Sequence, residues 1–289
     1  MKPGLSLDEL VDLMDRRGLI IEDKPSCAAF LAAANYYRFS GYARYFQKAP
    51  HRGDNDFRPG TSFGEIRAVH DADEALRTAL IRPLAQVELM LRSHVARVIS
   101  DEHGAYGDYL KRDFYSDEPT VESCLRDLDR SRDRYIDHFR DDGDYSKLPV
   151  WSAVEAWSFG TLSKVIEHGG RGILAGSVAA STGIAKAGFA HRVRALVYLR
   201  NRCAHHSRLW HHHVIDAGPT PNNVRQRAKR TVGQFEPRSV LDVIASLDDM
   251  TSRSCVAEPL LPELVGARDR APDFWQGLCS PRRTRDHGI

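Results

Sequence analysis

The segment from Ser62 to Glu102 constrains the fold more than any other part of this 289-residue chain. Its apolar side chains recur every three or four residues, the spacing that places them along one face of an α-helix. A capping box, Ser62 with Glu65, marks where the helix begins. The apolar positions are Leu76, Leu80, Leu84, Val87, Leu91, Val95 and Val98. The sequence therefore predicts one long amphipathic helix here.

The remaining sequence also carries the signals of helices. Ser6 and Glu9 form a second capping box, before a helix that ends at Gly18. Pro25 begins another helix, which runs into an aromatic stretch over residues 35–42. Polar and turn-forming residues predict a loop over 51–60. Additional helices are expected over residues 121–140, 149–168, 189–206 and 239–250.

Alternating β-branched runs are scarce, so we predict an all-α helical bundle. We expect an N-terminal helical extension over 1–60, a helical core over 61–215, and a C-terminal helical region with a basic tail over 216–289. Hydrophobic residues make up 42% and charged residues 28%, which is ordinary for a soluble globular chain. No window approaches 18 consecutive apolar residues, and the N-terminus lacks a secretory signal, so we expect a cytoplasmic protein without a membrane partner.

The five cysteines are scattered and include no CxxC pair, which favours reduced, buried thiols over disulfides or a structural zinc site. The net charge is only +2, but the charges are segregated. Acids dominate residues 101–144, including Asp141 and Asp142, whereas residues 191–230 hold nine arginines and lysines against one acid, Asp216. This segregation suits either a surface that meets phosphates or direct pairing of the two segments.

The residues with the clearest chemistry follow one another from Arg200 to Trp210. On a helix, Asn201 and His205 lie one turn apart, so they are placed to hydrogen-bond and fix the imidazole tautomer. Arg200 points roughly 140° away from His205, nearer the apolar face. Histidine transfers protons near neutral pH and arginine binds a phosphoryl group that gains charge. The pair suits metal-independent RNA cleavage by the 2′-hydroxyl.

Two alternatives remain open from the residues alone. Arg200 is also suited to a structural role, paired with a buried acid such as Glu88 or Glu155. A set of nearby histidines is an alternative metal site, although the set lacks paired carboxylates and regular spacing. These histidines are His205, His206, His211, His212 and His213.

Arg200–His205 matches the R-x4–6-H signature of HEPN domains, and the longer string RNRCAHHSRLW resembles the Abi family of bacterial abortive-infection proteins. Three other strings resemble that family in the expected order. They are NYYRFSGY at 35–42, HDADEALR…ELMLRS at 70–93, and LPVWSAVE…SFGTLS at 148–163. The resemblance covers roughly residues 20–210 and implies a HEPN-like bundle with an N-terminal helical extension.

The resemblance also implies roles and partners. By match, Arg200 stabilises the phosphate, His205 is the general acid or base, and Asn201 orients it. His206 also satisfies the spacing and is the reserve candidate. HEPN ribonucleases usually act as dimers, so a homodimer is expected, and a regulatory noncoding RNA is a further expected partner.

We expect RNA contacts from the basic helix and from the aromatic stretch, where tyrosines stack on bases or else belong to the core. The residues concerned are Arg192, Arg194, Arg202, Arg208, Tyr36, Tyr37 and Arg38. The pairs Asp73–Arg77 and Glu88–Arg92 have the spacing of structural ion pairs on a helix. The resulting expectation is an anti-phage endoribonuclease that needs no cofactor, with a non-cleaving RNA-binding protein as the alternative.

Overall fold

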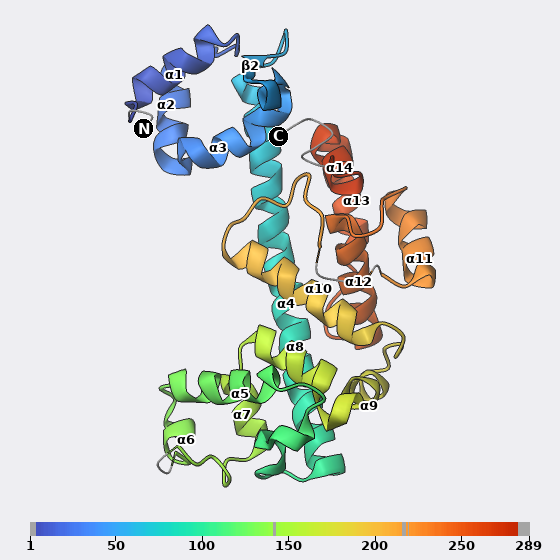
Figure 1. Cartoon of the computed structure of the whole chain (residues 1–289). Coiled ribbons are helices and arrows are strands. Elements are labelled where there is room, and N and C mark those ends of the chain that lie inside the picture. The colour runs from blue at the N-terminus through green and yellow to red at the C-terminus, as the bar shows by residue number, and fades with distance from the viewer. Residues whose placement is uncertain (1–3, 141–142, 216–217, 219, 283–289) are drawn as a thin grey trace. The chain divides into compact units, whose positions relative to one another are not determined.

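The computed structural model describes residues 4–140, 143–215, 218 and 220–282. Over these residues it confirms the all-α prediction, because they form fourteen α-helices and a single two-stranded sheet (Figure 1). Asp141, Asp142 and Asp216, and the tail arginines Arg283 and Arg285, lie outside the described residues.

The first seven α-helices are α1 (Leu7–Arg16), α2 (Lys24–Ala34), α3 (Tyr36–Ala43), α4 (Phe63–His103), α5 (Pro119–Arg130), α6 (Arg134–Asp137) and α7 (Val150–Ala156). The other seven are α8 (Phe159–His168), α9 (Leu174–Ser181), α10 (Phe189–Ala204), α11 (Asn222–Val232), α12 (Val240–Arg253), α13 (Leu261–Arg270) and α14 (Pro272–Cys279). Short 3-10 turns lie at Arg44–Phe46, Pro50–Arg52, Asp108–Leu110, Arg112–Phe114 and Gly170–Gly172.

The chain divides into two compact units. Unit 1 comprises residues 1–77, 208–212 and 266–289, and unit 2 comprises residues 78–207 and 213–265. The long helix α4 begins in unit 1 at the predicted capping box, where the N–H of Glu65 donates to Ser62 Oγ at 3.2 Å, and it continues into unit 2.

In unit 1, helices α1, α2 and α3 pack in sequence order, and rings of Phe30, Phe39 and Phe63 contact one another at 5.5–5.8 Å between centroids. The predicted loop over 51–60 is wrong in part. Strands β1 (Gln47–Ala49) and β2 (Asp54–Phe57) form an antiparallel hairpin around it. The physical reason is local, because Gly53 takes a left-handed φ of 86° and turns the chain back on itself.

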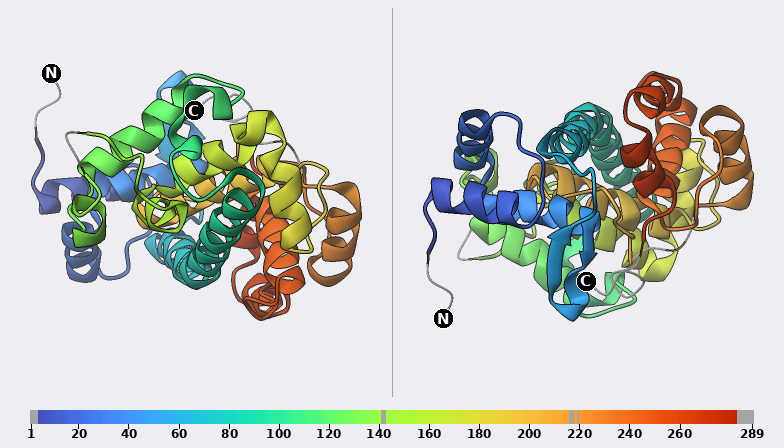
Figure 2. Two further views of the ribbon diagram at one scale, coloured as in Figure 1. Left: turned by 90° about the horizontal axis from the view of Figure 1, so that it is seen from below. Right: turned by 90° about the horizontal axis from the view of Figure 1, so that it is seen from above.

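In unit 2, α8 packs against α5, α9 and α10, while α10 and α11 both pack against α12. Figures 1 and 2 show α11 alongside α12. The predicted single helix over 149–168 is wrong, because it is two helices, α7 and α8, separated at Trp157 and Ser158. Ser158 caps α8, and Asp127 accepts hydrogen bonds from the Ser158 N–H at 2.9 Å and from Thr161 Oγ1 at 2.5 Å.

The cysteines are all free, as predicted, and four of the five are buried. Burial raises the pKa of the Cys124 thiol to about 12. Cys255 is the exception to the predicted burial, since it is exposed. No helix in the described part of the chain is both long and apolar enough to cross a lipid bilayer.

Candidate active site

Helix α10 carries the arginine–histidine segment, and its last turn sets the position of each residue. Its predicted apolar face is buried, with Leu196 and Leu199 fully covered and Cys203 2% exposed. The N–H of His205 donates to Asn201 O at 2.9 Å and closes the helix. His206 follows with a left-handed φ of 52°, which ends it. Both histidines therefore lie exposed at the C-terminal end of α10.

Arg200 is held in place by a carboxylate and an aromatic ring. Its Nε donates to Glu88 Oε2 at 3.2 Å, and its Nη2 donates to both Glu88 oxygens at 3.1–3.2 Å. Its carbon Cζ lies 5.5 Å from the centroid of the Phe159 ring. The side chain nonetheless remains 30% exposed. The Arg200 guanidinium is thus held through Nε and Nη2 by Glu88, while part of the side chain stays accessible to solvent.

Glu88 serves two arginines at once. Arg92 Nη2 donates to Glu88 Oε1 at 2.6 Å, so the predicted pair Glu88–Arg92 is confirmed. Arg92 also donates to the carbonyl oxygen of Val154. Of the two acids considered as partners for Arg200, Glu88 is the one used. The expectation of a buried Glu155 is wrong, since that residue is exposed.

Asn201 contacts Arg200 rather than His205. Its Oδ1 accepts a hydrogen bond from Arg200 Nη1 at 2.9 Å. Among the described residues, no side-chain hydrogen bond joins Asn201 to His205, and none joins Arg200 to His205. The structure therefore brings Arg200 and Asn201 together in one network and leaves the His205 side chain exposed and outside that network.

The predicted RNA-contacting arginines of α10 are in three different environments. Arg192 is 2% exposed, and its guanidinium donates to Asp249 Oδ2 at 2.8 Å, so this residue packs α10 against α12 and does not face solvent. Arg194 is 40% exposed and pairs with Glu167. Arg202 is half-buried, with Cζ 5.8 Å from the Tyr198 ring centroid. Arg194 and Arg202 remain on the surface.

The remaining predicted RNA contacts lie in unit 1. Tyr37 is 85% exposed and Arg38 is exposed, whereas Tyr36 is half-buried. Arg208 donates to the carbonyl oxygen of Gly41, and its Cζ lies 4.9 Å from the Tyr45 ring centroid. Tyr37 and Arg38 are thus the accessible members of this group.

A buried carboxylate, Asp73, holds unit 1 together. It accepts hydrogen bonds from Tyr42 Oη at 2.5 Å and from Arg77 Nη1 at 2.5 Å, which confirms the predicted Asp73–Arg77 pair. It also accepts from the backbone N–H groups of Leu209 and Trp210 at 3.1–3.2 Å. Burial raises the pKa of Asp73, and the Arg77 charge and these hydrogen bonds oppose that rise. Three segments far apart in the sequence, which contain Tyr42, Arg77 and Leu209–Trp210, therefore all bind the Asp73 carboxyl group.

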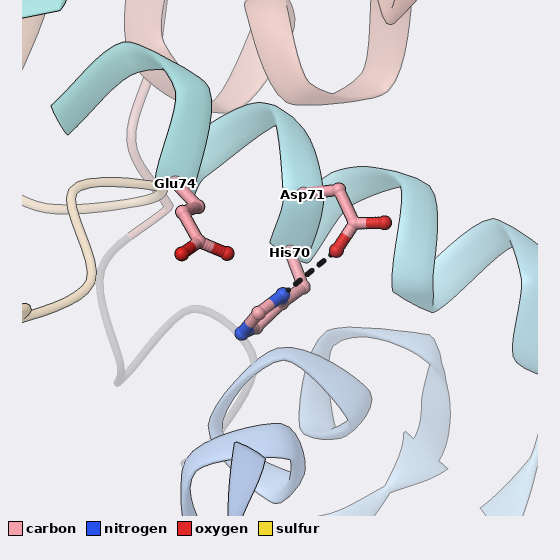
Figure 3. A group of neighbouring side chains, drawn as sticks. All are labelled: His70, Asp71 and Glu74. Atoms are coloured by element: carbon pink, nitrogen blue, oxygen red, sulfur yellow. Dashed lines mark hydrogen bonds and ion pairs between the residues drawn. The ribbon is translucent and has the colours of Figure 1, made fainter. Parts of the chain in front are cut away.

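The geometry does not assemble the histidines of the alternative metal site. Within the described residues, the one group with metal-ligating side chains close together is His70, Asp71 and Glu74 on α4 (Figure 3). Their ligand atoms lie within 4.8 Å of one another, and His70 Nδ1 is 3.1 Å from an Asp71 oxygen. The two acids are exposed carboxylates of a single helix, and such a group on its own assigns no metal.

Two important residues were missed by the sequence reasoning. Phe159, expected from the sequence only as a core residue within a motif, lies against the Arg200 guanidinium, and Asp249 binds three arginines from α10, α11 and α12. A signal for Asp249 was present, because Asp242 and Asp249 are seven residues apart on the apolar face of α12. Buried acids at such positions need cationic partners.

These features define a mostly helical protein with an anchored arginine and an exposed histidine at the end of one helix. The family model of the Abi-like proteins matches residues 29–211, more than half of the chain, and includes both the Asp73 network and the Arg200–His205 segment. The chain therefore belongs to the Abi-like protein family. No curated protein and no solved structure matches it. Membership in this family points to a part in abortive infection, a bacterial defence against phage.

Proposed function

We propose that this chain is a cytoplasmic, metal-independent endoribonuclease of abortive infection, with Arg200–His205 as its HEPN-type site and two copies acting together. The observation that carries the proposal is an anchored but partly exposed Arg200 followed, five residues later, by an exposed His205 at the C-terminal end of α10. A phosphate-binding group and a proton-transfer group on one short rigid segment are what RNA cleavage without a metal requires.

The proposed reaction is attack of an RNA 2′-oxygen on the adjacent phosphorus. A P–O2′ bond forms and the P–O5′ bond breaks, leaving a 2′,3′-cyclic phosphate and a 5′-hydroxyl. One proton leaves the 2′-hydroxyl and one reaches the departing 5′-oxygen. His205 performs one of these transfers, because an imidazole exchanges protons near neutral pH. His206, also exposed, is the reserve candidate for the same role.

Arg200 stabilises the charge that builds on the non-bridging phosphate oxygens. Its Nε and Nη2 face Glu88, and one hydrogen of Nη1 bonds Asn201, so the second hydrogen of Nη1 is the one directed to a phosphate. A guanidinium held on one side by a carboxylate loses little conformational entropy when it binds an anion on the other. Asn201 therefore acts by orienting Arg200.

A dimer follows from the need for two proton transfers. One exposed imidazole that removes the 2′-proton is not placed to protonate the leaving oxygen on the opposite side of the phosphorus. A second copy, related by a two-fold axis, would supply a second arginine–histidine pair to the same site. The HEPN-type R-x4-H pattern of Arg200–His205 supports this arrangement.

The test is cleavage of labelled RNA by purified protein in excess EDTA. We expect wild-type protein to cut, with products that end in a cyclic phosphate, and His205→Ala to lose activity at least about 100-fold. The matched control is His191→Ala, an exposed histidine elsewhere on α10. Equal cleavage by wild type and His205→Ala would overturn the assignment of His205.

A second candidate function is favoured by one observation. Glu88 is shared by Arg200 and Arg92, so one positive charge is in excess there, while over the ranges that the structure describes Arg200 and Asn201 make no side-chain hydrogen bond to His205; this suits a protein that holds a structured noncoding RNA without cutting it. Such a protein would bind RNA with nanomolar to micromolar affinity, and its RNA would remain intact during incubation. Sequencing of RNA that copurifies with His205→Ala and with wild type distinguishes a bound partner from a substrate, because only a substrate is shortened by the wild type.

A further inference from the structure

Three arginines converge on one buried carboxylate in unit 2. Asp249, 2% exposed on α12, accepts hydrogen bonds from Arg192 of α10 at 2.8 Å, from Arg253 of α12 at 2.9 Å, and from Arg227 of α11. Burial raises the pKa of Asp249, but the hydrogen bonds and charges of Arg192 and Arg253 hold it below the usual value for an aspartate. Asp249 is therefore ionised and supplies one negative charge for three guanidinium groups.

The positive charge at this cluster exceeds the negative charge by two. Arg192 is the most buried of the three, and its Nη1 is buried without a hydrogen-bond partner among the described residues. Burial lowers the pKa of Arg192, and the positive charges of Arg253 and Arg227 lower it further by a smaller amount. Three guanidinium groups that share one carboxylate leave positive charge in excess, which makes the site attractive to an additional anion.

The surface above the cluster is open and cationic. The side chains of Arg227 and Arg253 are 57% and 38% exposed, so both present hydrogen-bond donors to solvent. Helix α11 contains no acid over its whole length and also carries Lys229 and Arg230. The neighbouring buried acid, Asp242, lies 3.2 Å from Arg225 and so is already paired.

We propose that Arg227 and Arg253, supported by Arg192 and Asp249, form a binding site for a phosphate of the RNA backbone, separate from the Arg200–His205 segment. Arginine suits this ligand because its planar fork matches two phosphate oxygens. Asp249 holds the two exposed guanidiniums at a common point, which reduces the entropy lost when they close on one phosphate. Helix α11 extends the positive surface along which a strand would continue.

This inference rests on the proposed function, since it takes RNA as the ligand, but its readout is binding and not cleavage. The measurement is the fluorescence anisotropy of a labelled single-stranded RNA titrated with the full-length protein carrying His205→Ala, in whichever oligomeric state it purifies. The titration is repeated over a series of salt concentrations. Arg227→Gln and Arg253→Gln are compared with Arg130→Gln, which removes the same charge from an exposed arginine at the end of α5. Thermal melting verifies that each variant is folded.

We expect Arg227→Gln and Arg253→Gln each to weaken RNA binding about 3- to 10-fold at 0.1 M salt. Each variant should also reduce the slope of log K against log salt by about 0.7, the value for one phosphate contact on a single strand. Affinities and slopes equal to those of Arg130→Gln would overturn the site. Cleavage is measured separately, on protein with His205 intact. If the two variants weaken RNA binding and this protein does not cleave, the phosphate site is supported and the nuclease is contradicted. If the two variants bind normally and this protein cleaves, the phosphate site is overturned and the nuclease is supported.

Discussion

Arg200 donates three hydrogen bonds to the carboxylate of Glu88, a residue 112 positions earlier in the chain. Glu88 lies on α4 and Arg200 on α10, and Arg92 binds the same carboxylate from one turn further along α4. The arginine of the R-x4-H segment is therefore already a member of a structural ion network. Under the proposed function, a substitution of Arg200 would therefore affect both stability and activity.

Replacing Glu88 by Gln removes the charge of this carboxylate while keeping its size. We expect kcat for RNA cleavage to fall about 10-fold, because a neutral amide holds the Arg200 guanidinium less firmly in position. KM for RNA should stay constant or fall slightly, because the site gains one net positive charge. The measurement is steady-state cleavage at several RNA concentrations. A rise in KM with kcat unchanged would contradict a positioning role for Glu88.

Arg200→Ala and His205→Ala should separate activity from stability. Both should abolish the toxicity that we expect of overexpressed wild-type protein. Arg200→Ala should also destabilise the fold by about 1–3 kcal/mol, since Glu88 loses one of two partners, whereas His205→Ala should change it by less than about 0.5 kcal/mol. Growth after induction and urea unfolding measure the two effects. Toxicity equal to wild type in both variants would refute the catalytic assignment.

Asp73→Asn should destabilise unit 1 by about 2–4 kcal/mol, because four hydrogen-bond donors, Arg77 among them, lose a buried carboxyl group that accepts from all of them. The matched control is Asp71→Asn, two residues away on α4 and exposed, which should cost under about 0.5 kcal/mol. Urea unfolding followed by circular dichroism measures both. Similar losses in the two variants would show that the network around Asp73 contributes little.

Gly277 of α14 leaves no room for a side chain. A Cβ there would overlap the Nε1 and Cδ1 atoms of Trp210, whose ring lies against this helix. Gly277→Ala should therefore destabilise by about 2–3 kcal/mol through overpacking. Gly64→Ala on α4 is the control, because the nearest atom to the added Cβ would be Ser62 Oγ at 3.8 Å. This variant should raise the free energy of unfolding by up to about 1 kcal/mol, since alanine favours a helix more than glycine does. Equal melting temperatures for the two variants would contradict this close packing.

The stability of unit 2 should depend on pH through Asp249. Its folded-state pKa is lower than its unfolded-state value of about 3.9, so its contribution is complete above that value and is lost as the pH falls through the folded pKa. Asp249→Asn should be less stable than wild type by about 3 kcal/mol at pH 7, and this difference should shrink below about pH 4. Urea unfolding between pH 7 and pH 3 measures it. If the difference in unfolding free energy between wild type and Asp249→Asn did not change with pH, ionisation of Asp249 would be excluded as the source of the stabilisation.

The sequence by itself determined most of the helices, their main caps and the apolar face of α10, although the single helix predicted over 121–140 is two helices, α5 and α6. These depend on contacts within three or four residues, so periodicity and capping residues reveal them, as at Ser62 and Glu65. It also singled out Arg200 and His205 as candidate site residues, because their spacing is a local property of the chain. The predicted 149–168 helix was wrong because a distant acid, Asp127, stabilises the break at Ser158.

Only the tertiary structure decided which partner each charged residue has. Glu88 and Glu155 were equivalent candidates for Arg200 by sequence, and Arg192 was indistinguishable from its surface neighbours on α10. Pairing energies depend on distance and burial, which are set when helices far apart in sequence pack together. For the same reason, no local pattern could show which three arginines Asp249 binds, or that Asp73 binds the segment after His205.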